Sequence, residues 1–428
     1  MRYLFLIFLV SSGTILSAQD KLTLRIADLA KESESQVIKW RRHLHQYPEL
    51  SNREFKTMAY IAENLKGMDI SIETGMAHTG VVAVLDTGKP GPVIGLRADM
   101  DGLPVRERVV LPFTSKEESE YLSQKVGVMH ACGHDSHMAI LMGTATLLNK
   151  MKKDLVGKIV FVFQPAEEGA PSGEEGGAEL LIKQGLIDKY GIQVMYGLHI
   201  SSTTDAGKIT YRPMGIMAAA DLLSIKVKGK QVHGSKPWSG VDPIVVSAQI
   251  ILGLQTIVSR QIDITNEAAV VTIGKISGGV RNNIIPEEVE MLGTIRTLDT
   301  AMQTTIHNKI KLTAEKIAES AGATAEVNIK KMYPVTYNNP QLTAKMLPSL
   351  EKAAGSDNVL VMRASTGAED FSFYAKKVPG LFFFLGGKPK DINVIDASQH
   401  HTPDFYIDES GFIVGMKALA QLVVDTKL

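Results

Sequence analysis

Short, nearly continuous apolar runs recur along the first half of the chain and once near its end, with amphipathic stretches between them. The runs are Val81–Leu85, Val93–Arg97, Ile159–Phe163, Val194–Leu198 and Leu381–Leu385. Such runs are typical of strands buried on both faces, as in a mostly parallel sheet covered by helices. Helices are expected between them. One is opened by a capping-box pattern at Ser51 and Glu54 and extends to Leu65, and another covers Ser136–Met151.

The middle of the chain has longer helices and more strictly alternating strands. The expected elements are strands at Leu222–Val227, Ala269–Ile276, Glu288–Arg296 and Ala325–Lys330, a helix from Asp242–Pro243 to Arg260, and a helix over Ala301–Ser320. Their order, βαββαβ, is that of a ferredoxin-like unit. Because the chain is also too long for one ordinary core, we predict two domains. An α/β domain with a mostly parallel sheet, residues 19–212 and 333–428, is interrupted by an inserted ferredoxin-like domain, residues 213–332.

The first eighteen residues have the pattern of a secretory signal peptide. Arg2 precedes an apolar run over Tyr3–Val10, and small residues end at Ser17 and Ala18. The apolar run is too short for a permanent membrane span, and the alternative is a buried N-terminal helix. We expect cleavage after Ala18, export to the periplasm or medium, and no stable membrane insertion.

Composition and charge exclude some partners. The 46 basic and 46 acidic side chains balance, so no electrostatic attraction to nucleic acid or to an anionic membrane is expected. A single cysteine, Cys132, rules out an intrachain disulfide.

Acidic residues, histidines and this cysteine gather next to the predicted strands. Asp99 and Asp101 follow one strand, Glu167 and Glu168 follow another, and His199 ends a third, while His130–Asp135 and His400–Asp404 lie in loops. Each motif alone has an ordinary structural explanation, such as turn or helix-end chemistry. Together they favour a metal site, because ligands bind at the carboxyl ends of such strands and these side chains are the ligands of zinc and its neighbours.

A metal in this setting predicts hydrolysis. A divalent ion lowers the pKa of bound water from 15.7 to about 7 and polarises a carbonyl group. A carboxylate that binds no metal can take the water's proton and pass it to a leaving amine. The adjacent Glu167 and Glu168 suit a division into base and ligand, and Asp101 suits a supporting role that orients a ligand.

The joint pattern resembles the family of hippurate hydrolases, bacterial N-acyl-amino-acid amidohydrolases and plant auxin-conjugate hydrolases, within the aminoacylase-type metallopeptidases. The matching segments cover essentially the whole mature chain. They are Arg41–His45, Gly95–Pro104, His130–Asp135, Phe163–Gly169, Gly197–His199, Met217–Asp221, Gly240–Pro243, Asn283–Pro286, Gly293–Arg296, Gly367–Phe371 and His401–Pro403.

The resemblance implies a role for ten residues. It implies two divalent ions per subunit, zinc or manganese first and cobalt or nickel as alternatives, bound by Cys132, His134, Glu168, His199 and His401. It also implies that Glu167 is the general base and acid, supported by Asp101. His233 and Asn283 would meet the substrate, and Arg296 would hold a carboxylate, a task suited to its bidentate fork. The sequence departs from the family at Gly102, at Ser235–Lys236 and in Gly229–His233, which concerns the shape of the substrate pocket and leaves the metal ligands intact.

We therefore expect a metal-dependent hydrolase that cleaves the amide bond of N-acyl amino acids or small peptides, and a homodimer formed through the inserted domain. The resemblance further implies that His233 can reach the partner's active site. One rival is a thiol hydrolase with Cys132 as nucleophile, and another is a metal-binding or solute-binding protein of the cell envelope. Restoration of activity by added metal distinguishes a metal-dependent hydrolase from the thiol hydrolase. A hydrolase assay distinguishes it from the metal-binding or solute-binding protein. The acyl group, the preferred amino acid, the native metal and the physiological pathway stay open.

Overall fold

The computed structural model describes residues 18–427. The expected signal peptide therefore lies outside the described residues except for Ala18, where the first helix, α1 (Ala18–Gln46), begins. Its cleavage stays a prediction.

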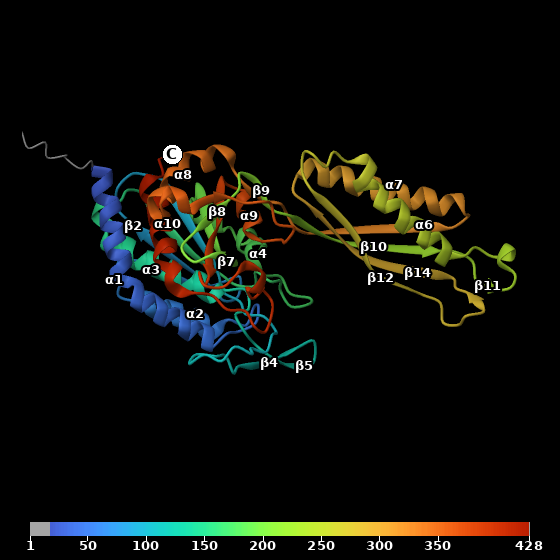
Figure 1. The fold of residues 1–428 in the computed structure, drawn as a ribbon, viewed down its shortest axis with the longest axis horizontal. Coiled ribbons are helices and arrows are strands. Elements are labelled where there is room, and N and C mark those ends of the chain that lie inside the picture. Colours follow the sequence, from blue (N-terminus) through green and yellow to red (C-terminus); the bar gives the residue numbers. More distant parts are fainter. Residues whose placement is uncertain (1–17, 428) are drawn as a thin grey trace, which may run out of the picture.

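The larger body of the molecule is built on one eight-stranded sheet (Figure 1). Its strands, in spatial order, are β1 (Ser71–Met76), β2 (Gly80–Asp86), β6 (Lys158–Gln164), β3 (Val93–Asp99), β7 (Val194–Asp205), β18 (Gly380–Lys388), β8 (Ile209–Tyr211) and β17 (Val359–Val361). The central strands β6, β3, β7 and β18 are parallel, whereas β1, β2 and β8 pair antiparallel at the sides. All five apolar runs are strands, which confirms the mostly parallel α/β sheet.

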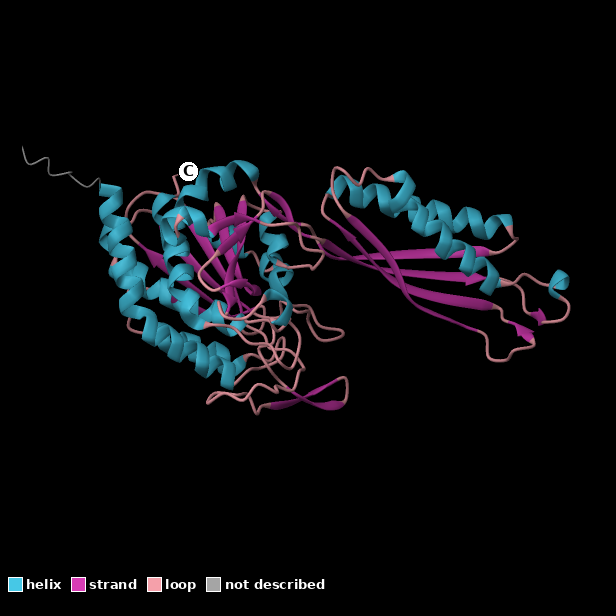
Figure 2. Cartoon of the chain, viewed as in Figure 1, coloured by secondary structure: helices cyan, strands magenta, loops and turns pink. Residues whose placement is uncertain are grey.

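Helices cover both faces of this sheet (Figure 2). One face packs against α1, α2 (Phe55–Leu65), α3 (His134–Lys150), α8 (Pro340–Ala354) and α10 (Phe412–Asp425). The other face packs against three shorter helices, α4 (Gly177–Lys183), α5 (Leu186–Tyr190) and α9 (Phe371–Ala375). Because both faces are covered, side chains in the central strands are buried whichever way they point, which explains the continuous apolar runs.

The inserted segment forms a second sheet with its own core, set apart from the first sheet in Figure 1. Its elements are β10 (Ala219–Lys228), α6 (Pro243–Thr256), β12 (Ala269–Gly278), β14 (Glu288–Thr297), α7 (Thr300–Ser320) and β15 (Thr324–Tyr333). The strand order β12-β14-β10-β15 is antiparallel throughout, and the chain order is the expected βαββαβ. Asp242 caps α6 by accepting hydrogen bonds from the backbone N–H groups of Ile244 and Val245.

Short paired strands complete the chain. At the junction of the two bodies, β9 (Met214–Met217) pairs with β16 (Thr336–Asn338). The far tip of the inserted domain carries β11 (Val232–His233) paired with β13 (Ile284–Ile285). A hairpin of β4 (Glu118–Tyr121) and β5 (Gln124–Gly127) projects from the larger body.

Two local predictions were wrong. The helix to Leu65 exists, but Ser51 and Glu54 do not form its capping box, because Glu54 occupies the N-cap without a side-chain cap bond. The Ser51 hydroxyl instead donates to Asp101, and Glu54 accepts the backbone N–H of Ala166. His199 does not end its strand, since β7 continues through a β-favouring serine and threonine stretch to Asp205.

Candidate metal centre

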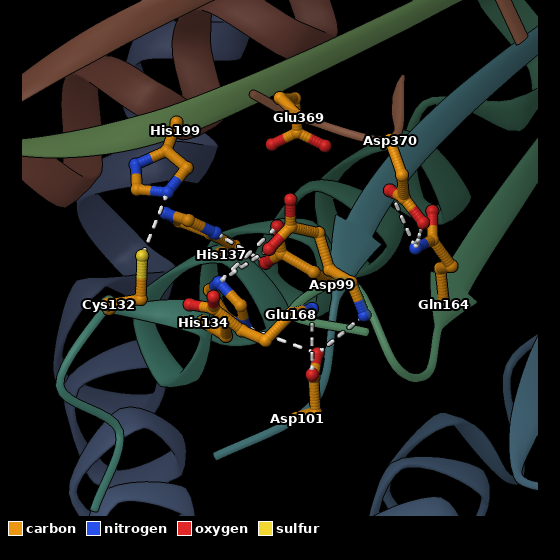
Figure 3. Close-up of polar contacts among 12 residues, drawn as sticks. Asp99, Asp101, Cys132, His134, His137, Gln164, Glu168, His199, Glu369 and Asp370 are labelled. Atoms are coloured by element: carbon orange, nitrogen blue, oxygen red, sulfur yellow. Dashed lines mark hydrogen bonds and ion pairs between the residues drawn. The ribbon is translucent and has the colours of Figure 1, made fainter. Parts of the chain in front are cut away.

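The five expected ligands, which come from four separate segments of the chain, converge in the folded structure. Figure 3 shows four of them, Cys132, His134, Glu168 and His199. Cys132 Sγ lies 3.3 Å from His199 Nε2 and 3.3 Å from His401 Nε2. His401 Nε2 is also 3.0 Å from Glu168 Oε1. Ligand atoms within 4.8 Å of one another form two groups made only of expected ligands, Cys132 with His134 and His199, and Cys132 with Glu168 and His401. A further group joins His134 and Glu168 to Glu167. Cys132 belongs to both of the first two groups, so the thiol is placed between two candidate ion positions.

Contacts on the far side of two rings, a hydrogen bond for His199 and an ion-pair contact for His134, leave Nε2 facing the cluster. His199 Nδ1 donates to the Ile200 carbonyl over 2.6 Å, which leaves Nε2 as the lone-pair nitrogen beside Cys132. His134 Nδ1 lies 3.4 Å from Asp101 Oδ1, and its Nε2 turns inward. A carbonyl or carboxylate behind the ring is the usual support for a metal-binding histidine. Burial lowers the pKa of His199, which keeps this ring in the neutral, ligating form.

The chemistry of the buried groups fits a cation. Both ring nitrogens of His134 are buried and have no hydrogen-bond partner among the described residues, although Asp101 Oδ1 lies 3.4 Å from Nδ1 and Glu167 Oε2 lies 3.8 Å from Nε2. Burial raises the pKa of Glu167 well above its ordinary range, and the neighbouring Glu369 and Glu168 act in the same direction. A divalent ion would stabilise these carboxylates and would bind the lone pair of His134 Nε2. We conclude that the residues present suit a metal site.

His137 lies close to this cluster but its nitrogens are already used. Its Nε2 accepts the Ile200 backbone N–H over 2.7 Å, so its Nδ1–H donates to Asp99 over 2.5 Å. His137 and Asp99 are therefore a hydrogen-bonded pair beside the expected ligands, although their atoms and those of His134 are close enough together to hold an ion.

The turn that carries Glu167 and Glu168 is fixed by carboxylates from other segments. Asp101 accepts the backbone N–H groups of Glu167 and Glu168 over 2.9 and 3.0 Å. Glu54 accepts the N–H of Ala166 over 3.0 Å, and Ala166 has a φ of 53°, a region unfavourable for a residue with a side chain. Asp101 thus holds the turn by two hydrogen bonds and lies 3.4 Å from the ring of His134, and its supporting role stays a prediction.

A buried charge cluster behind Glu167 was not foreseen from the sequence. Arg97 contacts Asp99 over 2.7 Å, Glu369 over 2.8 Å and Asp370 over 2.7 Å, and all four side chains are almost fully buried. Burial raises the pKa of Glu369 to about 7 and that of Asp370 to about 6, while Arg97 opposes both shifts. Arg97 and Asp99 are close in sequence to the expected site residue Asp101. Glu369 and Asp370 lie in Gly367–Phe371, a segment that carries the family resemblance but for which the sequence predicts no function.

Replacing Arg97 by Met should destabilise the protein by about 3–5 kcal/mol, because three buried carboxyl groups would lose their cation. The loss should shrink toward low pH, where the raised pKa values of Glu369 and Asp370 leave these groups neutral. Chemical denaturation at two pH values measures both effects. Arg53→Met is the matched control, because Arg53 pairs with Glu174 at the surface and its loss should cost at most about 1 kcal/mol. Equal losses for the two variants would contradict this account.

A cavity of about 740 Å³ opens over the cluster. Arg296 lines it together with Cys132, Glu167, Tyr333 and Phe384, so the structure places this predicted substrate residue beside the ligands. The hydroxyl of Tyr333, the last residue of β15, donates to the Glu167 carbonyl over 3.1 Å and so joins β15 to the turn that carries Glu167 and Glu168.

His233 and Asn283 do not lie at this cavity within one chain. Both are exposed at the β11–β13 tip, the end of the inserted domain furthest from the large sheet in Figure 1. They lie together, since Gly234 N donates to the Asn283 carbonyl over 2.8 Å. The Ser235 N–H donates to His233 Nδ1 over 3.1 Å, which leaves Nε2–H as a donor pointing elsewhere.

Two overlapping ligand groups lie next to the buried carboxylate of Glu167. This combination of metal ligands and a possible base defines a metal-dependent hydrolase of linear amide bonds. The thiol rival is disfavoured, because burial, and then Glu168 and Glu167, raise the pKa of Cys132 well above its ordinary value. A neutral thiol is a poor nucleophile.

Comparison with known proteins gives the family. Residues 95–425 match the description of peptidase family M20/M25/M40, and the chain belongs to this family. It is 39% identical over 399 residues to thermostable carboxypeptidase 1 of Saccharolobus solfataricus, covering 92% of this chain and 96% of the relative. It is 38% identical over 380 residues to N-acetyl-L-cysteine deacetylase of Bacillus subtilis, covering 89% and 85%.

A solved structure extends the likeness to the metal. The Bacillus subtilis YXEP protein, described as a dinuclear metal-binding peptidase of the M20 family, superposes with a TM-score of 0.76 at 33% identity. The match covers 92% of this chain and 98% of that one. The sequence-based identification of the family and of its metal-dependent amide hydrolysis is thereby confirmed.

Proposed function

We propose that this protein hydrolyses the amide bond of N-acyl amino acids, with small peptides as the alternative substrates, and that Glu167 is its general base and acid. The observation that carries the proposal is the position of Glu167, buried at the cavity wall beside five potential ligands. Relatives named as a carboxypeptidase and as a deacetylase of an N-acetyl amino acid support the same bond type.

The two adjacent glutamates have different proposed roles, Glu168 as a metal ligand and Glu167 as the general base and acid. Glu168 lies with His401 and Cys132 in a ligand group that Glu167 does not join, whereas Glu167 also lies beside Glu369 and Asp370 of the Arg97 cluster. Both glutamates lie within 4.8 Å of His134. When bound, the metal ions supply Lewis-acid activation of the water and of the substrate carbonyl. Glu167 takes a proton from the water and returns it to the amine as the C–N bond breaks. Asp101 and Tyr333 hold the backbone of its turn in place for this transfer.

Arg296 supports a substrate with a free carboxylate. Its half-buried side chain lines the cavity, and no residue in the described part of the chain forms an ion pair with it. A guanidinium in this position is suited to bidentate recognition of the amino-acid carboxylate.

A substrate screen tests this function. N-acetyl, N-benzoyl and indole-acetyl amino acids and dipeptides should be offered with zinc, manganese, cobalt and nickel in turn. We propose zinc or manganese as the working ion, because Cys with His suits zinc and carboxylate suits manganese. Hydrolysis of an N-acyl amino acid, but not of the matching C-terminal amide, is the expected result. Arg296→Met should remove that preference mainly through KM. No hydrolysis with any metal would contradict the proposal.

We also propose a homodimer through the inserted domain. Ile244, Val245 and Leu252 are exposed apolar residues on α6, and the edge strand β12 adds Val270 and Ile276. The helical stretch 243–261 is apolar and long enough to cross a membrane by length and composition alone, but its other face packs on the sheet of its own domain. A second copy covering this face in an isologous contact explains the exposed apolar surface.

Within such a dimer, His233 is proposed to donate Nε2–H to the oxyanion in the partner's active site. His233→Ala should then lower turnover by about 10²–10³-fold, with metal content and melting temperature unchanged. Lys230→Ala, on the same exposed tip, is the control and should keep activity. Mixed dimers of His233→Ala with Glu167→Gln should regain activity, because one site keeps both groups. No regain after verified subunit exchange would contradict action across the dimer.

Export completes the proposal. The sequence of Met1–Ala18 supports a signal peptide, and N-terminal sequencing of protein from the native host should begin at Gln19. A chain that still begins at Met1 would contradict it.

A further inference from the structure

We propose that Glu369 is a specificity-determining residue that accepts a hydrogen bond from the N–H of the scissile amide and, after cleavage, from the leaving amine. This inference rests on the amide hydrolysis proposed above. It assigns the enzyme a requirement for an N–H at the scissile bond, which would make it discriminate against esters and against N-alkylated amides.

The first observation is that one carboxylate oxygen of Glu369 is fixed and the other is free. Arg97 Nη2 lies 2.8 Å from Oε1, and the Phe371 backbone N–H donates to the same oxygen over 2.9 Å. Oε2 is buried and has no hydrogen-bond partner among residues 18–427. The side chain is only 1% exposed, so bulk water does not readily satisfy the free oxygen. An unsatisfied buried carboxylate oxygen is costly and calls for a donor.

The second observation is the position of this carboxylate. Glu369 lines the cavity above the ligands, and one of its carboxylate oxygens lies within 4.8 Å of a carboxylate oxygen of Glu167. Figure 3 shows the Glu369 carboxylate directed toward the group that contains Glu168 and His134. A donor between the two glutamates would therefore contact both carboxylates.

The neighbouring Asp370 makes the contrast clear. Its Oδ1 contacts Arg97 over 2.7 Å, and its Oδ2 accepts the Ala178 N–H and the Gln164 side-chain amide, each over 2.7 Å. Asp370 thus has all its oxygens occupied within the protein. Neutralising Arg97 needs no free oxygen on Glu369, so a purely structural role does not account for it.

The substrate offers one donor that must come to this place. Glu167 returns its proton to the nitrogen of the breaking bond, so that nitrogen must lie within hydrogen-bond distance of Glu167. An amide nitrogen carries one hydrogen and the product amine carries more. Glu369 Oε2 is placed to accept one of them, which orients the nitrogen lone pair toward Glu167 as it develops. In an ester, the oxygen that replaces the amide nitrogen carries no hydrogen. It cannot donate to Glu369 Oε2, and its lone pairs would face that carboxylate.

The test compares two substrates that differ only at this atom, an N-benzoyl amino acid and the matching O-benzoyl hydroxy acid. In Glu369→Gln, Arg97 and the Phe371 N–H keep the side-chain carbonyl at the Oε1 position, so the amide NH2 replaces Oε2 and presents a donor. The amide-to-ester ratio of kcat/KM should fall by about 10- to 100-fold, the range for a hydrogen bond to a charged group. Metal content should equal that of the wild type.

Asp370→Asn is the matched control, since it removes a charge from the same cluster without facing the cavity. Asp370→Asn should lower kcat/KM for the amide and for the ester by the same factor. If Glu369→Gln also lowers kcat/KM for both substrates by one common factor, the proposal is overturned. Glu369 is then only a structural partner of Arg97. Glu369→Asp should recover part of the amide preference.

The wild-type enzyme provides a measurement that needs no variant to fold. After division by the hydroxide rate constants of the two substrates, kcat/KM should favour the amide, and the N-methyl amide should be cleaved poorly. Equal efficiency toward the amide, its ester and its N-methyl form would overturn the role of Glu369 while amide hydrolysis itself stands. If the wild type cleaves no amide under any metal, the proposed function is what fails.

Discussion

Glu167→Gln is expected to lower turnover by about 10²- to 10⁴-fold while the protein keeps its metal, because the variant retains the side-chain shape but cannot take a proton from water. The change should leave the melting temperature equal or higher. Glu167 is a buried carboxyl whose pKa is raised by burial and by Glu369 and Glu168, so its neutral replacement relieves repulsion. Steady-state kinetics on an N-acyl amino acid, with metal analysis of the same preparation, checks this result.

Glu168→Gln is the matched control for this experiment. The two glutamates are neighbours on one turn held by Asp101, and both substitutions remove one charge from the same place. Glu168 lies 3.0 Å from His401 and belongs to a ligand group with Cys132, so its loss should weaken the binding of at least one ion. If both variants lose the same amount of metal and of activity, the division into base and ligand is wrong.

The buried strands could be predicted because they depend on local pattern. A strand buried on both faces needs a run such as Val81–Leu85 or Leu381–Leu385, whatever its neighbours are. The start of α6 could be predicted in the same way, since Asp242 and Pro243 mark a helix start by chemistry confined to one turn.

The polar contacts could not be predicted in the same way, because they join distant segments. Ser51 and Glu54 have the spacing of a capping box, yet their side chains bind Asp101 and the Ala166 N–H, which only the folded sheet brings near. Arg97 and Asp370 are 273 positions apart in the chain, and no periodicity pairs them. The five potential ligands were found from composition at strand ends and from the resemblance, not from any spacing between them.

Removal of metal is expected to abolish hydrolysis altogether. The five potential ligands come from four segments of the chain, and an ion bound among them would hold these segments together. The buried carboxylates around Glu167 also depend on a cation for their charge balance, so the stripped protein should be less stable and should melt at a lower temperature. A chelator should therefore inactivate the enzyme reversibly, and the thiol of Cys132 alone should support no turnover.

The most direct test of metal-dependent hydrolysis is a titration of the stripped enzyme. Metal-free protein is supplied stepwise with zinc or manganese while hydrolysis of an N-acyl amino acid and the bound metal are measured together. Activity should be absent at the start, rise with added metal and level off at about two ions per chain. Full activity in a rigorously metal-free preparation would contradict the account.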